Sequence, residues 1–220
     1  PKPKLSRSSN TSFSANVVTR YASASNEKTG HLDFNIGLKN WAFYTAFSYT
    51  DFDDLKMGKH GPTDYLRNEY VITNNGIDEI VQNSNPRLQK FTGYSQYNFL
   101  QKVFYRIDDN TNIDAALRYS ATSDYPRYDR LIRYDNDQLR SAEWYYGPQK
   151  WFMANAQLTR LSSASSIHDK VKLSVAYQNY QESRNDRNLY SENLRTRKEN
   201  VDVLSANVDF EKDLSEKSEI

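Results

Sequence analysis

The feature that most constrains this chain is an alternation of apolar and polar residues with a period of two. Between residues 113 and 122, for example, Leu117 and Tyr119 alternate with Arg118 and Ser120. This period places successive side chains on opposite faces of a β-strand, whereas an amphipathic helix has a period of about 3.6 residues. The segments with this pattern are 13–21, 31–38, 41–49, 91–105, 113–122, 152–159, 171–178 and 204–211. We predict about eight antiparallel strands, each near the ~10 residues that a tilted membrane strand needs.

The connections between these segments alternate in length. The short links are 39–40, 108–112 and 162–170, and the long ones are 51–88, 123–149 and 182–200. Outer-membrane β-barrels have short periplasmic turns and longer extracellular loops. We therefore expect the first strand to run outward and the eighth to run inward. The link 26–30 is an exception, because it is short but falls on the outer side.

The composition favours a membrane sheet over a water-soluble domain. Only 37% of the 220 residues are hydrophobic, yet 14% are aromatic. A disordered chain would have fewer aromatic residues, and a soluble domain would have more aliphatic residues for its core. No run approaches the ~20 apolar residues of a membrane helix, so a spanning form would have to be a closed barrel. A soluble β-sandwich with one wet face explains the alternation equally well, but it does not explain three long connections.

Charge and residue usage argue against several other classes of function. The net charge is +1, so no basic face for nucleic acid is expected. The chain has no Cys and three scattered His residues, so we predict no metal site and no cofactor. No Ser/His/Asp constellation or phosphate-binding Gly-rich loop is present, which argues against an enzyme. The start at Pro1, without a visible signal peptide, suggests an internal piece of a longer chain.

The alternation also predicts which side chains share a face of the sheet. The residues predicted to face lipid are Leu117, Tyr119, Leu173, Val175, Ala206 and Val208. The residues predicted to face a polar lumen are Arg118, Lys172, Gln178, Asn207 and Asp209. A slip of one residue would reverse every assignment. We further expect an open arc, in which the first and eighth strands are not paired with each other.

Two of the long connections carry candidate ligand-binding residues. The link 123–149 is rich in Tyr and Arg, and the link 51–88 holds further Tyr, Arg and His residues. Arg binds carboxylates in a bidentate manner, and Tyr and Trp provide rigid contact area. The candidates are Tyr65, Arg67, Arg127, Tyr128, Arg130 and Trp144. The alternative is that these residues pack loop against loop, and that His60 is a surface residue rather than a ligand to haem iron.

Several segments of this chain resemble parts of TonB-dependent outer-membrane receptors. The branch that they resemble takes up haem, haemoglobin or iron complexes. The segments that carry the resemblance are 54–58, 60–62, 64–71, 89–102, 126–131 and 142–149, together with 2–6, which resembles the segment that leaves the plug domain. The resemblance implies that residues 1–220 are the N-terminal part of an antiparallel up-and-down transmembrane β-barrel of about 22 strands. The plug domain and the later strands would lie outside this chain.

The resemblance also implies a location and partners. It places the chain in the cell outer membrane, in contact with lipid, as a multi-pass barrel that imports a scarce nutrient. The implied ligand is haem, a ferric siderophore or a host haem protein, and a surface lipoprotein is a further partner. Energy would come from the TonB–ExbB–ExbD system through the plug.

Two rival interpretations remain open at this point. One is a complete eight-stranded outer-membrane barrel that acts as an anchor or adhesin, with an interior filled by side chains. The ending at 215–220, in an expected turn rather than on a strand with a terminal aromatic residue, argues against it. The other rival is a phospholipase-type barrel enzyme, which would need a Ser/His pair on its outer wall.

Overall fold

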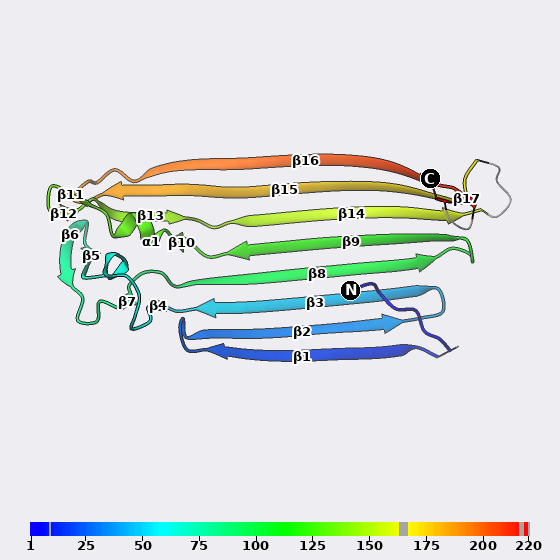
Figure 1. The fold of residues 1–220 in the computed structure, drawn as a ribbon, viewed down its shortest axis with the longest axis horizontal. Helices are drawn as coiled ribbons and strands as arrows, with labels where there is room; N and C mark the ends of the chain where they lie inside the picture. The colour runs from blue at the N-terminus through cyan, green and yellow to red at the C-terminus, as the bar shows by residue number, and fades with distance from the viewer. Residues whose placement is uncertain (9, 163–166, 216–217, 220) are drawn as a thin grey trace.

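The fold is an all-β arrangement of antiparallel strands. The computed structural model describes residues 1–8, 10–162, 167–215 and 218–219. Within these residues, ten strands form one antiparallel sheet. The long strands are β1 (Ser12–Ala22), β2 (Glu27–Gly37), β3 (Trp41–Phe52), β8 (Tyr94–Arg106), β9 (Thr111–Thr122), β14 (Lys150–Leu161), β15 (Lys170–Asn188) and β16 (Arg195–Glu211). These strands pair with their neighbours in sequence order, up and down (Figure 1).

The remaining elements lie in the connections. They are β4 (Leu55–Lys56), η1 (Thr63–Tyr65), β5 (Glu69–Asn74), β6 (Ile77–Gln82), β7 (Leu88–Gln89), β10 (Tyr125–Pro126), α1 (Tyr128–Leu131), β11 (Tyr134–Asp135), β12 (Gln138–Leu139), β13 (Ser141–Tyr146), β17 (Asp213–Ser215) and β18 (Ser218–Glu219). Figure 1 shows that β4 to β7 and β10 to β13 gather at one end of the long strands. The short link between β1 and β2 lies at this same end, as predicted.

The predicted strand segments each overlap one of the long strands, although β2 ends at Gly37 rather than at residue 38, and the connections differ from the prediction. Strand β8 begins at Tyr94 rather than at residue 91. The expected loop 182–200 is wrong, because β15 and β16 continue through it as a paired hairpin and leave only 189–194 between them. The other two long links contain their own hairpins and the short helix α1. The link 162–170 lies partly outside the described residues.

The two faces of the sheet differ as the alternation predicts. The register aligns Leu117 with Ala154, then with Tyr177 and Leu204, so one face carries an apolar row across four strands. The opposite face carries Arg118, Lys172, Gln178, Asn207 and Asp209. The predicted division of side chains between the two faces is therefore confirmed.

Burial differs between the two faces. Many large apolar side chains on the first face are exposed, from 38% at Leu117 to 83% at Leu204. Ala42, Ala46 and Asn35, on the polar face, are buried. A sheet in water normally buries its apolar face and exposes its polar one, so this arrangement is the reverse.

The sheet is open in the described part of the chain. Strand β1 pairs only with β2, and β16 pairs only with β15, so the two edge strands do not pair with each other. This confirms the predicted open arc. Among the described residues, the eight long strands do not close into the barrel expected under the eight-strand alternative.

The first residues of the chain lie against the polar face. The Lys4 amide donates to Asn35 Oδ1 at 2.8 Å, and Asn35 Nδ2 donates to the Lys4 carbonyl at 3.0 Å. Farther along the face, Lys102 Nζ donates to the Pro1 carbonyl at 2.8 Å. This segment passes so close to Gly37 that a Cβ there would lie 2.5 Å from the Lys4 carbonyl oxygen. Glycine at position 37 therefore permits the close approach.

Candidate functional site

The six candidate residues from the sequence lie on the loops at one end of the sheet. Tyr65 ends η1 and Arg67 follows it, while the other four lie in or beside α1 and β13. The Tyr128 hydroxyl donates to the Tyr65 carbonyl at 2.7 Å, and Arg67 Nη1 donates to the Leu131 carbonyl. The structure therefore brings the two predicted loops together through these residues.

Arg67 is the most deeply buried of the six, with 2% of its surface exposed. Burial lowers the pKa of its guanidinium group and raises the pKa of the Tyr128 hydroxyl to about 12. The Arg67 guanidinium also lies 6.0 Å from the centre of the Tyr128 ring. Arg67 and Tyr128 thus hold one loop against the other, as the packing alternative predicted for them.

Arg127 and Arg130 lie around an aromatic pair on β13. The Arg127 guanidinium is 5.4 Å from the Trp144 ring centre and donates to the Tyr146 hydroxyl at 2.8 Å. The Arg130 guanidinium is 5.9 Å from the same Trp144 ring, and its Nε has no hydrogen-bond partner among the described residues. Cations at these distances from an aromatic face are attracted to the ring. That Arg127 and Arg130 bind a ligand stays a prediction.

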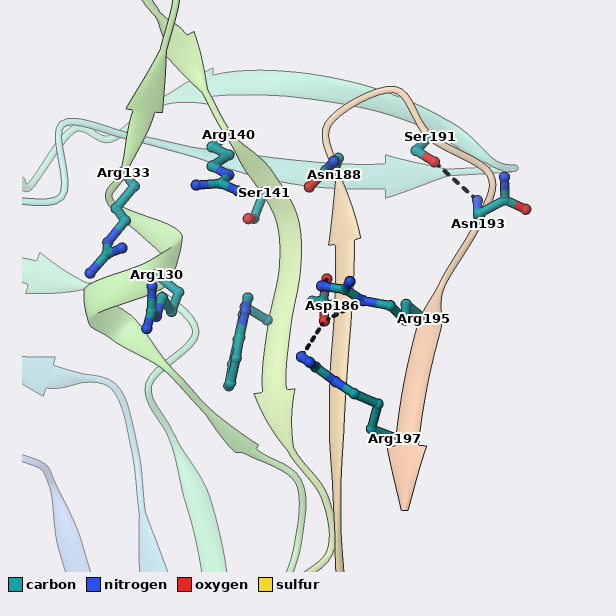
Figure 2. Close-up of a pocket in the computed structure, with 11 residues that line it drawn as sticks. Arg130, Arg133, Arg140, Ser141, Asp186, Asn188, Ser191, Asn193, Arg195 and Arg197 are labelled. Carbon is teal, nitrogen blue, oxygen red and sulfur yellow. Dashed lines mark hydrogen bonds and ion pairs between the residues drawn. The ribbon is translucent and has the colours of Figure 1, made fainter. Parts of the chain in front are cut away.

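A pocket of about 530 Å³ lies beside Arg130 and Trp144, between the α1 region and the hairpin of β15 and β16. Five arginines line it, and Asp186 is the one acidic residue in its lining. Figure 2 shows Arg130 and Arg133 on one side and Arg195 and Arg197 on the other, with Arg140 above. We define these five residues (Arg130, Arg133, Arg140, Arg195 and Arg197) as the arginine pocket.

The arginine pocket lies on the polar side of the sheet. Along the unbroken strand β15, Asp186 has the same parity as Lys172 and Gln178, which are on the polar face. Arg195 is the direct cross-strand partner of Asp186, and Trp144 is its partner on β13. Side chains of one parity share one face of a strand, so the arginine pocket continues the polar face beyond the apolar rows.

A second pocket lies across α1 from the first and is lined differently. It has a volume of about 450 Å³, and its walls include Phe52, Tyr94, Tyr125 and Tyr128. The rings of Phe52 and Tyr94 stack with their centres 4.7 Å apart, and Tyr125 meets Tyr94 edge-on at 4.6 Å. The loop end of the polar face therefore offers an aromatic pocket beside a cationic one.

A buried ion pair fixes the loops on the opposite side of the sheet. Asp78 on β6 accepts two hydrogen bonds from Arg187 on β15, at 2.8 and 2.9 Å, and their side chains are 1% and 8% exposed. Arg187 also donates to Glu143 at 2.7 Å and to Thr73 at 2.8 Å. These bonds lower the pKa of Asp78 and raise that of Arg187. We call these four residues (Thr73, Asp78, Glu143 and Arg187) the loop lock.

The sequence analysis missed part of the site. Arg195 and Arg197 were not proposed, because 182–200 was interpreted as a loop without fixed geometry. The spacing of two residues between them was the available signal, since strand residues two apart share a face. Arg133 and Arg140 belong to the Tyr- and Arg-rich link but were not among the chosen candidates.

The histidines lie in separate parts of the fold. His31 Nδ1 lies 2.6 Å from Ser48 Oγ, its Nε2 lies 3.1 Å from Asp33, and His60 is exposed in the loop before η1. In the described part of the chain, no group of three or more His, Cys, Asp or Glu residues is placed to bind a metal. Nor do the residues described include a helix with the length and apolar character to cross a membrane.

Comparison with known proteins does not assign the chain to a family. No family model matches its sequence, no curated protein matches it, and no solved structure matches its fold.

Proposed function

We propose that this chain forms part of the wall of a TonB-dependent outer-membrane receptor that imports a scarce nutrient such as haem or a ferric siderophore. The observation that carries the proposal is the reversed sheet, which has exposed apolar side chains on one face and a polar opposite face. The wall would belong to a barrel of about 22 strands, closed by strands outside this chain.

The exposed apolar face supports a location in lipid. Soluble monomers rarely expose large contiguous apolar surface, because burying such surface from water is favourable. Here it spans neighbouring strands through residues such as Leu32, Phe47, Leu117, Val175 and Val208. Lipid would cover this face, and the strands satisfy the backbone hydrogen bonds that lipid cannot. The polar face would then line the lumen.

The position of the loops supports an orientation. The connections that contain η1, α1 and four hairpin strands lie at one end of the sheet, and short turns such as 107–110 lie at the other. In outer-membrane barrels the longer loops are extracellular. The two pockets would therefore face the outside of the cell, where a ligand arrives. Import would depend on the plug domain and the TonB–ExbB–ExbD system, with a surface lipoprotein as a further partner.

The location and orientation can be tested with single cysteines, because this chain has none of its own. We would label His60→Cys, Asp109→Cys and Val175→Cys of the complete protein with a membrane-impermeant maleimide. His60→Cys should react in intact cells, and Asp109→Cys should react only after the outer membrane is permeabilised. Val175→Cys should stay protected until detergent removes lipid. Equal labelling of all three in intact cells, or recovery of the protein as a soluble species, would contradict the proposal.

The nutrient can be tested by growth. Cells that lack the gene should fail to grow when haem or one ferric siderophore is the sole iron source, and the wild-type gene should restore growth. A variant with Arg127→Ala and Arg130→Ala should restore growth at least about tenfold less effectively at limiting ligand, because hot-spot truncations cost roughly 2 kcal/mol or more. Surface expression must match the wild type. Unchanged growth of the deletion strain on every iron source would contradict the assignment.

A further inference from the structure

We infer that the arginine pocket binds a compact polyanion, with two or more carboxylate or phosphate groups set apart from one another. The inference rests on the proposed function for its external location, but the binding itself can be measured separately. The pocket has a volume within the range of roughly 300–1,000 Å³ that is typical of small-molecule sites.

The pocket carries more positive charge than its own carboxylates balance. Asp186 accepts from Arg195 at 2.7 Å and from Arg197 at 3.3 Å, so one carboxylate serves two guanidinium groups. Asp129 lies 3.6 Å from Arg130 and 3.9 Å from Arg133, and it also pairs with Arg127 at 2.8 Å. Like charges gathered around one pocket repel one another, and an anion bound among them relieves that repulsion.

Arg140 is the residue with the most freedom to bind such an anion. Its side chain forms no ion pair within the described ranges, although its backbone is fixed. The Arg140 amide donates to the Arg133 carbonyl at 2.8 Å, and its carbonyl accepts from the Leu189 amide at 3.1 Å. A guanidinium on an anchored backbone can bind a carboxylate or phosphate with two parallel hydrogen bonds.

The arrangement of the arginines selects the shape of the anion. Arg130 and Arg133 come from the α1 region, whereas Arg195 and Arg197 extend from β16 on the other side (Figure 2). A molecule with separated anionic groups can contact both groups of arginines. Ser141 and Asn188 line the same pocket and offer neutral hydrogen bonds.

The side of the sheet on which the pocket lies excludes lipid phosphates as the source of the anion. Arg195 and Arg197 share a face with Lys172 and Gln178, and the apolar side chains proposed to contact lipid are on the opposite face. The anionic groups therefore belong to a molecule that enters from the loop end.

The inference is tested by titrating the complete receptor, purified in detergent, with citrate and with tripolyphosphate. Inorganic phosphate and a neutral sugar serve as reference ligands. The test variant carries Arg140→Gln and Arg197→Gln. The matched control is Lys198→Gln, because Lys198 is adjacent to Arg197 on β16 but on the other face of the strand. Folding of each variant is verified by its shift in electrophoretic mobility on heating.

We expect citrate or tripolyphosphate to bind more tightly than inorganic phosphate, and affinity to fall with added salt. The double variant should weaken binding by about tenfold or more for each arginine removed, which is on the order expected when charged hydrogen bonds are lost. The control Lys198→Gln should change the affinity less than about twofold. A preference for citrate would identify a carboxylate ligand, and a preference for tripolyphosphate a phosphate one. Equal binding by the double variant and the wild type, or no binding at all, would overturn the inference, while the cysteine labelling would still decide the receptor proposal.

Discussion

Replacement of Arg187 by alanine is expected to destabilise the loops beside β13 and β15 by about 3–5 kcal/mol, because it leaves a buried carboxylate without its partner. Asp78 is 1% exposed and would keep only its bonds from Thr73 and from the Tyr190 amide. The loop lock ties the β5–β6 hairpin to β13 and β15, so its loss should free that hairpin and the adjacent link 189–194. The long strands should remain assembled.

Hydrogen exchange of the folded protein measures this effect. Amides in 69–82 and 189–194 should exchange faster in Arg187→Ala, whereas those in β8 and β9 should not change. Arg184→Ala is the matched control, because Arg184 lies on the same strand but is 40% exposed, and exposed ion pairs contribute about 1 kcal/mol or less. Adding Asp78→Ala to Arg187→Ala should recover part of the loss, since no unpaired charge then remains. Wild-type protection in the single variant would show that the loop lock does not hold the loops.

The loop lock also predicts how loop stability depends on pH. The bonds from Arg187 lower the pKa of Asp78 below its ordinary value of 3.8. A carboxylate whose pKa is lowered in the folded state stabilises the fold at every pH above its ordinary pKa. This stabilisation is lost as the pH falls through the pKa that the group has in the folded state. The loops that the loop lock holds should therefore stay ordered throughout the neutral range and loosen only in strong acid.

The second large effect is expected on the apolar face of the sheet. Under the proposed function, Val175→Arg should reduce the stability of the complete protein in lipid vesicles by about 2–4 kcal/mol if the residue lies near the bilayer midplane. Ala176→Arg is the matched control, because Ala176 is the next residue of β15 and lies on the polar face. It should change stability far less, since an arginine in a polar lumen stays hydrated.

Urea titration of the folded protein in vesicles, followed by electrophoretic mobility, measures the stability of both variants. The comparison also separates the membrane interpretation from a soluble sheet. Val175 is 46% exposed, so in a soluble protein an arginine there would reach water and cost little. Equal stabilities for Val175→Arg and Ala176→Arg would contradict a lipid contact at this face.

The sequence predicts the long strands well because their pattern is local. The alternation around Leu117 and Val175 predicts that these segments are strands and which face of the sheet each side chain is on. It also predicts the order of the strands, since each long strand pairs with its neighbours along the chain. Two hairpins in the loops could also have been predicted. Asn75-Gly76 joins β5 and β6 with both residues at positive φ, the usual pair for a two-residue hairpin turn. Asn136 and Asp137, also at positive φ, join β11 and β12.

The site was less predictable because its parts come from separate segments. Arg67 and Arg140 are the same type of residue, and both lie in connections between long strands. Arg67 is buried beneath Tyr128, whereas Arg140 is exposed at the arginine pocket. The alternation of a strand cannot distinguish them, since both lie in connections whose path depends on tertiary packing. The pairing of Asp78 with Arg187 links residues 109 positions apart, and no local pattern relates them.

The contact of the first residues with the sheet has a mechanical consequence. The amide group of Asn35 acts like a piece of neighbouring backbone, because it both accepts from and donates to Lys4. The Ser6 amide adds a bond to the Leu38 carbonyl at 3.1 Å. A force that pulls the segment along the sheet loads these three bonds at the same time, whereas a force that lifts it away breaks them one after another. The segment therefore resists sliding more strongly than peeling, and the direction of a pull decides whether it stays attached.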